Sequence, residues 1–480
     1  MKGKEVIVIG SGFAGLTCAA LLAKEGLKVT VLEQNYLPGG CTSSYWRKGF
    51  VFEAGATTVV GMDPAMPLNF VVDQLGIEIP MRKLKLPMKV YLSDNTVLRR
   101  HQDLDRWVKT AKDVFSGNQE GFWKECMKVS QFVWNSSTRY RQFPPTRWSD
   151  YGSLLRNFDF SDLNHAKYAL ISTQRIMEKY QVASPAFTKF VNEQLLITAQ
   201  NNANEVNFLF GAAALCYTNY SNYYIDGGLI NLVNPLIKFI EKNEGKIQYR
   251  TGVKSIQRGK HKYFIDTTKG KFESDFVVSG IPMNNTLKLF DDLKIDKRKV
   301  LSSPKLNGAF QMGIGFKSEK EFESLHHQIH LNKPLAQTGS NSIFLSLSHA
   351  DDQMRSDLPN HRVASISTHV SDPERSIIDS EEVEKEIIDN LEKWDFLTRS
   401  DIVYQHSSTP KSWHKWTRRE WGFVGGYPQY MDTKPWQMLD ARLDRKKAYI
   451  CGDTTYPGQG IPGTALSGII ASEKLKADWL

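Results

Sequence analysis

A glycine-rich turn between two strand-like runs near the N-terminus constrains the fold more than any other feature. Residues 5–9 read EVIVI, a β-branched apolar run that is typical of a buried parallel strand. The turn, GSGFAG over residues 10–15, is followed by apolar residues at helical spacing that end at Gly26. A second strand is expected over residues 28–32, with Glu33 at its end. This order predicts a βαβ unit and therefore a doubly wound α/β sheet.

Each glycine of the turn has a mechanical reason to be glycine. Gly10 permits the tight turn, Gly12 lets the backbone approach a pyrophosphate, and Gly15 lets the helix pack closely on the strands. The helix N-terminus adds free N–H groups and a partial positive charge for phosphates. Glu33 is placed to accept hydrogen bonds from a ribose 2′-hydroxyl. The segment predicts a dinucleotide site, and the alternative is an ordinary βαβ turn.

A second glycine pair follows the acid. The run Pro38-Gly39-Gly40-Cys41 is not needed to bind NAD, so it indicates a ligand that extends beyond an ADP half. Cys41 is best interpreted as a small packing residue. A redox role, or a covalent link to the ligand, is the alternative.

The C-terminal end repeats the pattern of strand, glycine turn and helix. Residues 448–451 (AYIC) predict a strand and residues 461–476 a helix, with Gly452 and Asp453 between them. We expect Asp453 to hydrogen-bond ribityl hydroxyls or a water that bridges to a phosphate. The helix start over residues 460–463 would direct N–H groups and the helix dipole at a ring system. A two-ended site of this kind fits FAD, whereas NAD alone would not need it.

The two glycine loops together resemble the carotenoid desaturase and isomerase family of flavoproteins. The N-terminal motif is G-S-G-F-A-G…E…P-G-G-C, and the motif at residues 452–463 is G-D-T-T-Y-P-G-Q-G-I-P-G. Within that group, the second motif most resembles the hydroxycarotenoid 3,4-desaturases. A third match, Y-I-D-G-G over residues 224–228, resembles the family's Y-P-x-G-G helix start. Glu53 stands where the family usually has Asp, which leaves its contact open.

The resemblance implies FAD as the cofactor and an architecture like that of amine oxidases and phytoene desaturases. A Rossmann-like FAD-binding domain is predicted over residues 1–75, 225–300 and 431–480. It is interleaved with an α+β substrate and membrane-associated domain, predicted over residues 76–224 and 301–430. The residues predicted to bind the cofactor are Gly10, Gly12, Phe13, Ala14, Gly15, Glu33, Gly39, Gly40, Val253, Gly452, Asp453, Gly460, Ile461 and Gly463.

The resemblance also implies an activity. We expect an FAD-dependent desaturase that converts C–C to C=C in a carotenoid, with the 3,4 bond of an acyclic or monocyclic hydroxycarotenoid as the target. The electron acceptor, oxygen or a quinone, is left open, and no catalytic base stands out. Alternatives are a carotenoid cis–trans isomerase, a retinol or carotenoid saturase, and a small-substrate amine- or porphyrinogen-oxidising flavoprotein. A lipid carrier without FAD is a further alternative, against which the intact loop over residues 453–463 argues.

The net charge of +9 admits nucleic acid, an anionic lipid surface or an anionic cofactor as a partner. The basic residues are dispersed, and the absence of a long basic run or zinc-finger spacing argues against nucleic-acid binding. No apolar run approaches the roughly 20 residues needed to span a bilayer. Five cysteines at irregular spacing fit a reduced compartment. We therefore expect a cytoplasmic protein that associates peripherally with the membrane in which a polyene substrate is stored.

Two clusters leave alternatives open. Residues 122–148 mix aromatic with basic side chains, and the stretch is interpreted either as helical core or as a membrane-facing or tunnel-lining surface. His326, His327 and His330 form H-H-x-x-H, but no cysteine or acid stands at a spacing that would complete a metal site. A solvated loop is therefore expected there, and no metal site is predicted.

Overall fold

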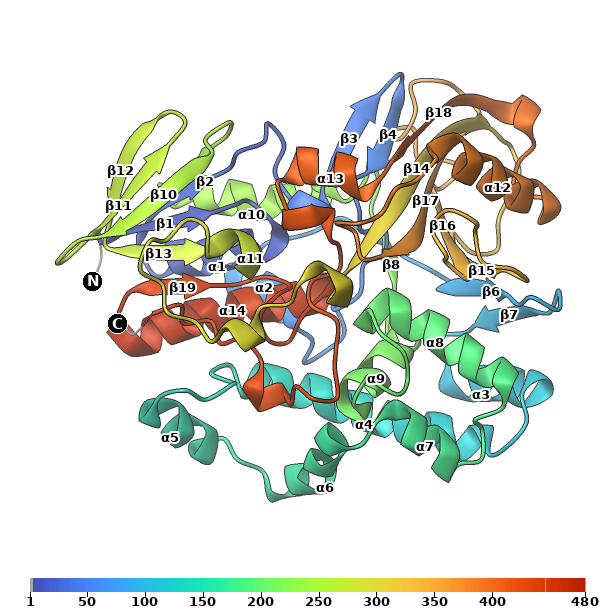
Figure 1. The fold of residues 1–480 in the computed structure, drawn as a ribbon, viewed down its shortest axis with the longest axis horizontal. Helices are drawn as coiled ribbons and strands as arrows, with labels where there is room; N and C mark the ends of the chain where they lie inside the picture. The colour runs from blue at the N-terminus through green and yellow to red at the C-terminus, as the bar shows by residue number, and fades with distance from the viewer. Residues whose placement is uncertain (1–2, 445, 480) are drawn as a thin grey trace.

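A five-stranded parallel sheet forms the first half of the molecule, which is described over residues 3–444 and 446–479 by a computed structural model (Figure 1). Its strands come from three separate parts of the chain, and every neighbouring pair is parallel. In sheet order they are β19 (Ala448–Ile450), β13 (Phe276–Ser279), β1 (Glu5–Ile9), β2 (Lys28–Leu32) and β9 (Lys246–Gln248). The predicted doubly wound α/β class is confirmed, and β13 lies beside β1 in the middle of the sheet.

Helices cover one face of the parallel sheet and a small antiparallel sheet covers the other. The helices are α1 (Phe13–Lys24), α2 (Pro67–Leu75), α10 (Ile230–Lys242) and α14 (Gly460–Trp479). The opposite sheet consists of β10 (Val253–Arg258), β11 (Tyr263–Thr267) and β12 (Gly270–Ser274). Alternate residues of β1 point to the two sides: Val6 and Val8 join the helical cluster, and Ile7 joins the cluster under β11. The β-strands therefore have no water-facing side, and only their ends are free for ligands.

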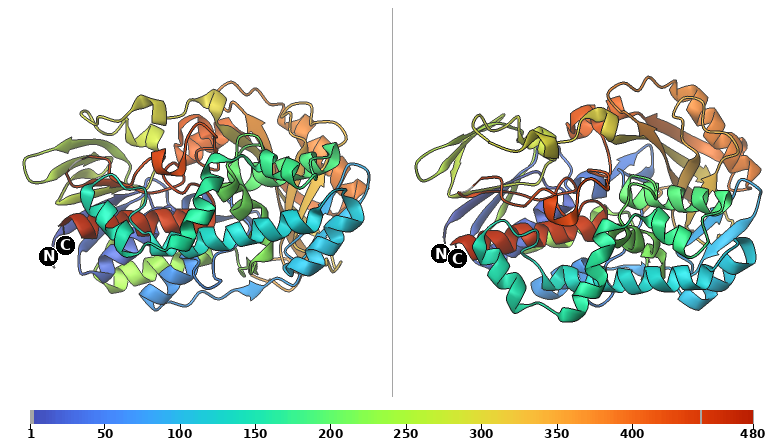
Figure 2. Two further views of the ribbon diagram at one scale, coloured as in Figure 1. Left: turned by 90° about the horizontal axis from the view of Figure 1, so that it is seen from below. Right: turned by 60° about the horizontal axis from the view of Figure 1, so that its bottom comes forward.

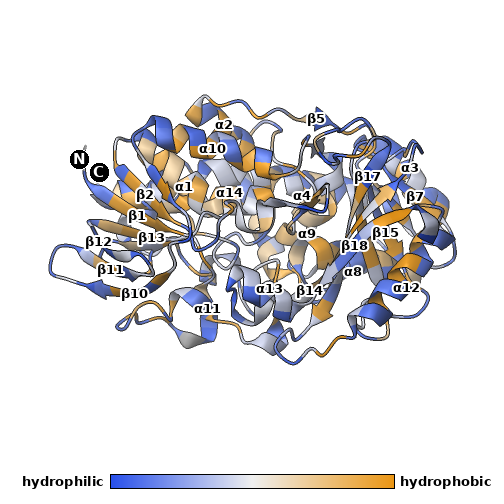
Figure 3. Ribbon diagram, turned by 90° about the horizontal axis from the view of Figure 1, so that it is seen from above, coloured by the Kyte–Doolittle hydropathy of each residue, from blue (hydrophilic) through white to orange (hydrophobic). Residues whose placement is uncertain are grey.

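A seven-stranded sheet forms the other half, and all its neighbouring pairs except β15–β6 are antiparallel. In order they are β18 (Ile402–Ser408), β14 (Asn307–Lys317), β17 (His361–Ser371), β16 (Ser342–Leu347), β15 (His326–His330), β6 (Met88–Tyr91) and β7 (Val97–Arg100). Helix α12 (Ser380–Lys393) contributes to the apolar cluster on one face. Figure 3 shows long hydrophobic stretches on the strands of both sheets.

A helical region packs against the seven-stranded sheet and against the helices that cover the parallel sheet (Figure 2). Its helices are α3 (Leu104–Val114), α4 (Gln119–Arg139), α5 (Trp148–Arg156), α6 (Leu163–Ala166), α7 (Thr173–Lys179), α8 (Pro185–Ala199) and α9 (Phe208–Leu215). Phe122 and Trp123 are fully buried in its core, so the core interpretation holds for the start of the aromatic stretch. Trp148, at the other end, is 91% exposed. No helix in the described residues is long and apolar enough to cross a bilayer.

The prediction of a solvated loop at the three histidines is wrong. His326, His327 and His330 lie in β15, where every residue is buried. The reason is tertiary: β15 is an interior strand between β16 and β6, so both of its backbone edges are paired. The imidazole rings pack against aromatic rings, and His326 Nδ1 also lies 2.8 Å from Ser346 Oγ. Burial lowers the pKa of His326 to about 4, so the ring is neutral at pH 7.

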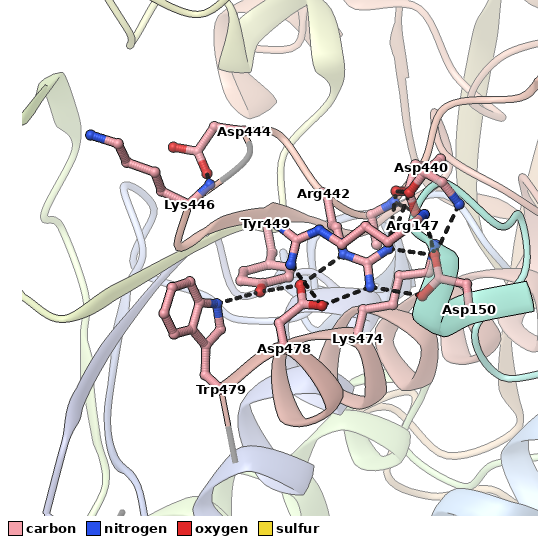
Figure 4. A network of polar contacts seen from close by, with 12 residues as sticks. Arg147, Asp150, Asp440, Arg442, Asp444, Lys446, Tyr449, Lys474, Asp478 and Trp479 are labelled. Carbon is pink, nitrogen blue, oxygen red and sulfur yellow. Dashed lines mark hydrogen bonds and ion pairs between the residues drawn. The ribbon is translucent and has the colours of Figure 1, made fainter. Parts of the chain in front are cut away.

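Helix α5 is attached to the parallel-sheet half by a buried ion-pair network (Figure 4). Arg442 donates two hydrogen bonds to Asp150 of α5, at 2.7 and 2.9 Å, and two to Asp478 of α14, at the same distances. The three side chains are 4%, 0% and 2% exposed. Lys474 pairs with Asp440 beside them. Because Arg442 forms a bidentate pair with each of the two buried carboxylates, it fixes the position of α5 on α14.

Candidate functional site

A cavity of about 840 Å³ lies where the two halves of the molecule meet. On one side it is lined by residues that follow the carboxyl ends of β1, β2, β13 and β19: residues 10, 12–14, 33–37, 280–282 and 452–453. On the other side it is lined by β14, β17 and β18 of the seven-stranded sheet. Ligands of open parallel sheets bind outside the carboxyl ends of the strands, so the cavity is in the position expected for a dinucleotide.

Most of the predicted cofactor residues line this cavity. Those that do are Gly10, Gly12, Phe13, Ala14, Glu33, Gly39, Gly40, Val253, Gly452 and Asp453. Gly15, Gly460, Ile461 and Gly463 are not among the lining residues. Gly15 instead packs the helix on the strand, because a Cβ atom there would lie 2.5 Å from the Gly10 carbonyl oxygen. The start of α14 contributes Thr464 to the cavity wall, a residue that was not predicted.

The two N-terminal glycine loops touch and form one cradle. Gly10 has φ +86°, a backbone conformation that favours glycine. Gly12 is the N-cap of α1, and no side chain caps that helix end. A Cβ atom on Gly40 would lie 3.4 Å from the Gly12 Cα atom, whereas one on Gly12 would meet no protein atom closer than 3.8 Å. The cradle therefore presents an uncapped helix N-terminus and open space at Gly12, which fits a pyrophosphate.

Glu33 is held in place by the loop that it faces. Its Oε2 atom accepts hydrogen bonds from the Ser11 amide at 2.8 Å and from the Ser11 hydroxyl at 2.6 Å. Its Oε1 atom accepts a hydrogen bond from the Asn35 amide at 2.7 Å. A carboxylate offers about four acceptor positions. The side chain is therefore fixed by three bonds and keeps capacity for the predicted ribose hydroxyl.

Asp453 is paired with a residue that the sequence analysis did not single out. Its Oδ2 atom lies 2.9 Å from Arg419 Nη2, and both side chains line the cavity. Arg419 also donates from Nε to the Phe423 carbonyl at 2.9 Å. The sequence signal for Arg419 was only a local excess of basic residues.

Burial raises the pKa of the nearby Cys41 thiol, which disfavours the thiolate and fits the packing role predicted for Cys41.

The contact of Glu53, left open by the sequence, is structural. Glu53 forms a buried ion pair with Arg355 and accepts hydrogen bonds from Ser44 Oγ at 2.6 Å and from the Leu229 amide at 3.1 Å. A Cβ atom on Gly228 would lie 2.7 Å from Arg355 Nη1, so the glycine pair before α10 is needed for this close approach. Glu53 thus ties β4 (Phe50–Glu53) to the start of α10.

The sheet side of the cavity carries two rows of polar residues. Gly313 of β14 is the register partner of Ser365 on β17 and of His406 on β18. The adjacent row consists of Gln311, Ser367 and Ser408, and both rows line the cavity. A Cβ atom on Gly313 would lie 2.5 Å from the His406 ring and 2.7 Å from the Phe52 ring, so glycine leaves room for both rings over the sheet.

A tyrosine–histidine pair closes this part of the cavity. The Tyr45 hydroxyl, on β3 (Ser44–Arg47), lies 2.7 Å from His406 Nε2, and both residues line the cavity. Burial raises the pKa of Tyr45 to about 12. Burial also lowers the pKa of His406 to about 4, with a smaller contribution from Arg47. Both groups are therefore neutral at pH 7, and the pair can donate and accept hydrogen bonds.

Comparisons with known proteins agree with this geometry. Residues 13–476 match the model of a family described as flavin containing amine oxidoreductase. Prolycopene isomerase 1 of an Oncidium hybrid cultivar is 25% identical over 499 aligned positions, which cover 99% of this chain and 84% of the relative. A Flavobacterium 1-hydroxycarotenoid 3,4-desaturase is 22% identical, covering 68% and 66%. All-trans-retinol 13,14-reductase of Danio rerio is 27% identical, covering 52% and 42%.

Among solved structures, a putrescine oxidase double mutant superimposes with a TM-score of 0.66 at 13% identity, covering 99% of both chains. At that identity the likeness concerns the fold alone. The family match confirms FAD as the cofactor. The named relatives confirm the predicted resemblance to the carotenoid desaturase and isomerase group.

Proposed function

This chain belongs to the flavin containing amine oxidoreductase family, and we propose that it is an FAD-dependent carotenoid desaturase. The proposed reaction converts C–C to C=C at the 3,4 position of an acyclic or monocyclic hydroxycarotenoid. The observation that carries the proposal is the single cavity, which runs from the glycine cradle to the polar rows of the seven-stranded sheet. A cofactor on the cradle and a substrate on the sheet would therefore share one cavity.

In this proposal, the residues that follow the strands of the parallel sheet bind the cofactor. We assign the diphosphate to Gly10, Gly12 and Gly40, and the ribose to Glu33. Asp453 and the start of α14 would face the ring end, with Arg419 holding the Asp453 carboxylate in position. Bound FAD supplies a hydride acceptor, which is the chemistry that removing hydrogen from a polyene requires. The protein's own part is to orient the substrate against that acceptor and to exclude water.

Expression in a carotenoid-producing bacterial host tests the proposal, with extracted pigments separated by liquid chromatography and detected by mass. A desaturase gives a product lighter by H₂ and redder in absorbance. A product of unchanged mass at a new retention time would instead mean an isomerase, and a gain of H₂ a saturase. If no acyclic or hydroxylated carotenoid changes while the purified protein loses its flavin absorbance on addition of a small amine, the proposal is wrong.

A carotenoid cis–trans isomerase is the second candidate. It is favoured by the likeness to prolycopene isomerase, which extends over 99% of this chain, whereas the desaturase relative covers 68%. Isomerisation leaves the mass unchanged and needs no net electron acceptor. The same chromatogram therefore separates the two candidates without a further experiment.

We propose that the protein associates peripherally with membranes through the segment of residues 148–170. Large apolar side chains are concentrated there on the surface: Trp148 (91% exposed), Tyr151, Leu155 (74%), Phe158, Phe160 (81%), Leu163 and Leu170. The exposed Arg156 and Lys167 suit an anionic lipid surface. Two acidic residues of the segment are already neutralised, since Asp150 pairs with Arg442 and Asp162 with Arg139. Figure 1 places α5 and α6 along one edge of the molecule.

Flotation with phosphatidylcholine vesicles containing phosphatidylglycerol tests this surface. Wild-type protein should float, and a Trp148→Ser/Leu155→Ser/Phe160→Ser variant should stay in the soluble fraction. Ile377→Ser is the matched control, because Ile377 is 92% exposed and lies outside the segment. Equal flotation of the triple variant and the wild type would reject the segment, and no flotation of the wild type would reject membrane association.

A further inference from the structure

Beside Glu33 the cavity has a wall to which no part of the cofactor has been assigned. The Thr251 amide donates to the Glu33 carbonyl at 2.7 Å, and Val253, two residues further along the chain, lines the cavity. Tyr36, three residues after Glu33, lines it as well. In a dinucleotide the ribose carbon that bears the adenine ring is next to the carbon that bears the 2′-hydroxyl. With the ribose on Glu33, the adenine ring therefore lies against this wall.

Two half-exposed aromatic side chains stand at the same place. The rings of Tyr36 and Trp416 have their centroids 6.3 Å apart and their planes tilted by 56°. The residues are 49% and 58% exposed, and both line the cavity, so each has surface that a ligand there can contact. They come from opposite halves of the molecule, because Tyr36 follows β2 and Trp416 belongs to α13 (Pro410–Thr417), which follows β18.

The end of α13 is tied to the parallel-sheet half by hydrogen bonds from two side chains. Gln34 Nε2 donates to the Thr417 carbonyl at 2.8 Å. Asn285 Nδ2 donates to the Arg418 carbonyl at 2.7 Å, and Asn285 Oδ1 accepts from the Glu420 amide at 3.0 Å. Gln34 and Asn285 both line the cavity. The helix end that carries the tryptophan is therefore fastened at the cavity wall.

The backbone after α13 is held in an unusual conformation. Arg418, the C-cap of the helix, has φ +57°, and Trp421 has φ +54°, values that residues other than glycine adopt infrequently. Between them, Arg419 Nη2 lies 2.9 Å from Asp453 Oδ2 in the C-terminal glycine loop. Such conformations persist where the surrounding contacts determine them. Trp416 is therefore positioned by a fixed segment and not by a free loop.

We propose that Tyr36 and Trp416 hold the adenine ring of FAD, with Trp416 positioned by the ties at the end of α13. The inference goes beyond the proposed reaction, because it concerns the cofactor alone, and it rests on the assignment of the ribose to Glu33. A flat base gains from stacking on tyrosine and tryptophan rings in a way that the sugar and the diphosphate do not. Because one ring comes from each half, the bound base also joins α13 to the parallel-sheet half.

Titration of the apoprotein with FAD, with ADP and with FMN tests the assignment, because ADP carries the adenine ring and FMN lacks it. Trp416→Ala should weaken the binding of FAD and ADP about tenfold, through loss of one stacked ring, and leave FMN unchanged. Tyr36→Ala should act in the same direction. Trp416→Phe keeps an aromatic ring and should retain most of the affinity. Trp436→Ala is the control, because Trp436 is 48% exposed and does not line the cavity.

Three results would overturn the inference. The same ADP affinity in wild type, Trp416→Ala and Tyr36→Ala would place the adenine ring elsewhere. Equal losses toward ADP and FMN would mean that the two rings support the cavity as a whole. A Trp416→Phe variant as weak as Trp416→Ala would mean that stacking is not the contact.

If ADP and FMN bind too weakly to be measured, the titration with FAD decides. A loss in Trp416→Ala that is absent in Trp416→Phe supports the inference, and equal affinities reject it. Carotenoid conversion does not enter these titrations. Failure of the proposed desaturase reaction would therefore leave their result unchanged, so the two failures are distinguishable.

Discussion

The two large sheets of this protein use opposite strategies to build one cavity. The five-stranded parallel sheet is covered on both faces, so its contribution comes from the loops at the carboxyl ends of its strands. The seven-stranded sheet is apolar on one face and turns polar side chains of its strands toward the ligand on the other. The first arrangement offers backbone N–H groups, and the second offers side chains. The parallel sheet therefore suits a fixed cofactor, and the mixed sheet suits the part of the ligand that determines specificity.

The largest predicted difference between the two sheets is their stability at acid pH. The seven-stranded sheet should open at a higher pH than the parallel sheet. The parallel strands contain no histidine, whereas burial lowers the pKa of five histidines of the seven-stranded sheet: His326, His327, His330, His369 and His406. Burial lowers their pKa values, to about 4 for His326 and about 3 for His327. The unfolded chain takes up these protons below pH 6.5, so stability is full above that pH and is lost as the pH falls toward 4.

Each such histidine weakens folding by about 1 kcal/mol per pH unit in that window, several kcal/mol in total by pH 5. Hydrogen exchange measured between pH 7 and 4.5 should therefore show β14 to β18 opening before β1, β2 and β13. Simultaneous opening of both sheets, or earlier opening of the parallel sheet, would contradict this reading.

The second largest predicted effect is a loss of unfolding free energy when the ion-pair network that holds α5 on the parallel-sheet half is broken. Arg442→Met leaves Asp150 and Asp478 buried without their partner. Breaking a buried pair in this way costs about 3–5 kcal/mol. Denaturant unfolding measures the loss, and the flavin spectrum of the folded variant should be unchanged because Arg442 does not line the cavity. Arg399→Met removes two ion pairs at the surface, with Asp389 and Glu392, and should cost about 1 kcal/mol or less.

Gly12→Ala should weaken FAD binding about 100-fold, or about 3 kcal/mol, while the protein still folds. The added methyl group meets no protein atom within 3.8 Å, so any loss comes from the cofactor's approach to the backbone. Titration of the apoprotein with FAD measures the affinity. Gly152→Ala is the control, since a Cβ atom there has no neighbour within 4 Å and Gly152 lies in α5. Unaltered FAD affinity in Gly12→Ala would place the pyrophosphate elsewhere.

The smallest predicted effect is a loss of unfolding free energy on substitution of Glu53. Glu53→Asp shortens the side chain that reaches Arg355, Ser44 and the Leu229 amide. Loss of one of these hydrogen bonds should cost about 1 kcal/mol in unfolding free energy. Glu53→Gln, which removes the charge beside the buried Arg355, should cost more. If Asp is tolerated no better than Gln, the contact depends on length and not on charge.

The difference between the sheets also explains what the sequence could reveal. The cofactor cradle was predictable because GSGFAG and the C-terminal glycine loop are local patterns in which each glycine has a stated backbone reason. The polar rows were not, because Gly313, Ser365 and His406 are separated by more than forty residues and meet only through strand register. Arg419 was missed for the same reason. The β15 histidines were misread because HHQIH is polar by composition and is buried only by its place in the sheet.

Anaerobic mixing of the FAD-loaded protein with a hydroxylated carotenoid tests the central claim most directly, since it asks whether a substrate on the seven-stranded sheet reaches a cofactor on the parallel one. The account predicts that the absorbance of oxidised flavin disappears and that the pigment is recovered lighter by H₂. Flavin that stays oxidised with every polyene, but is reduced by a small primary amine, would contradict it.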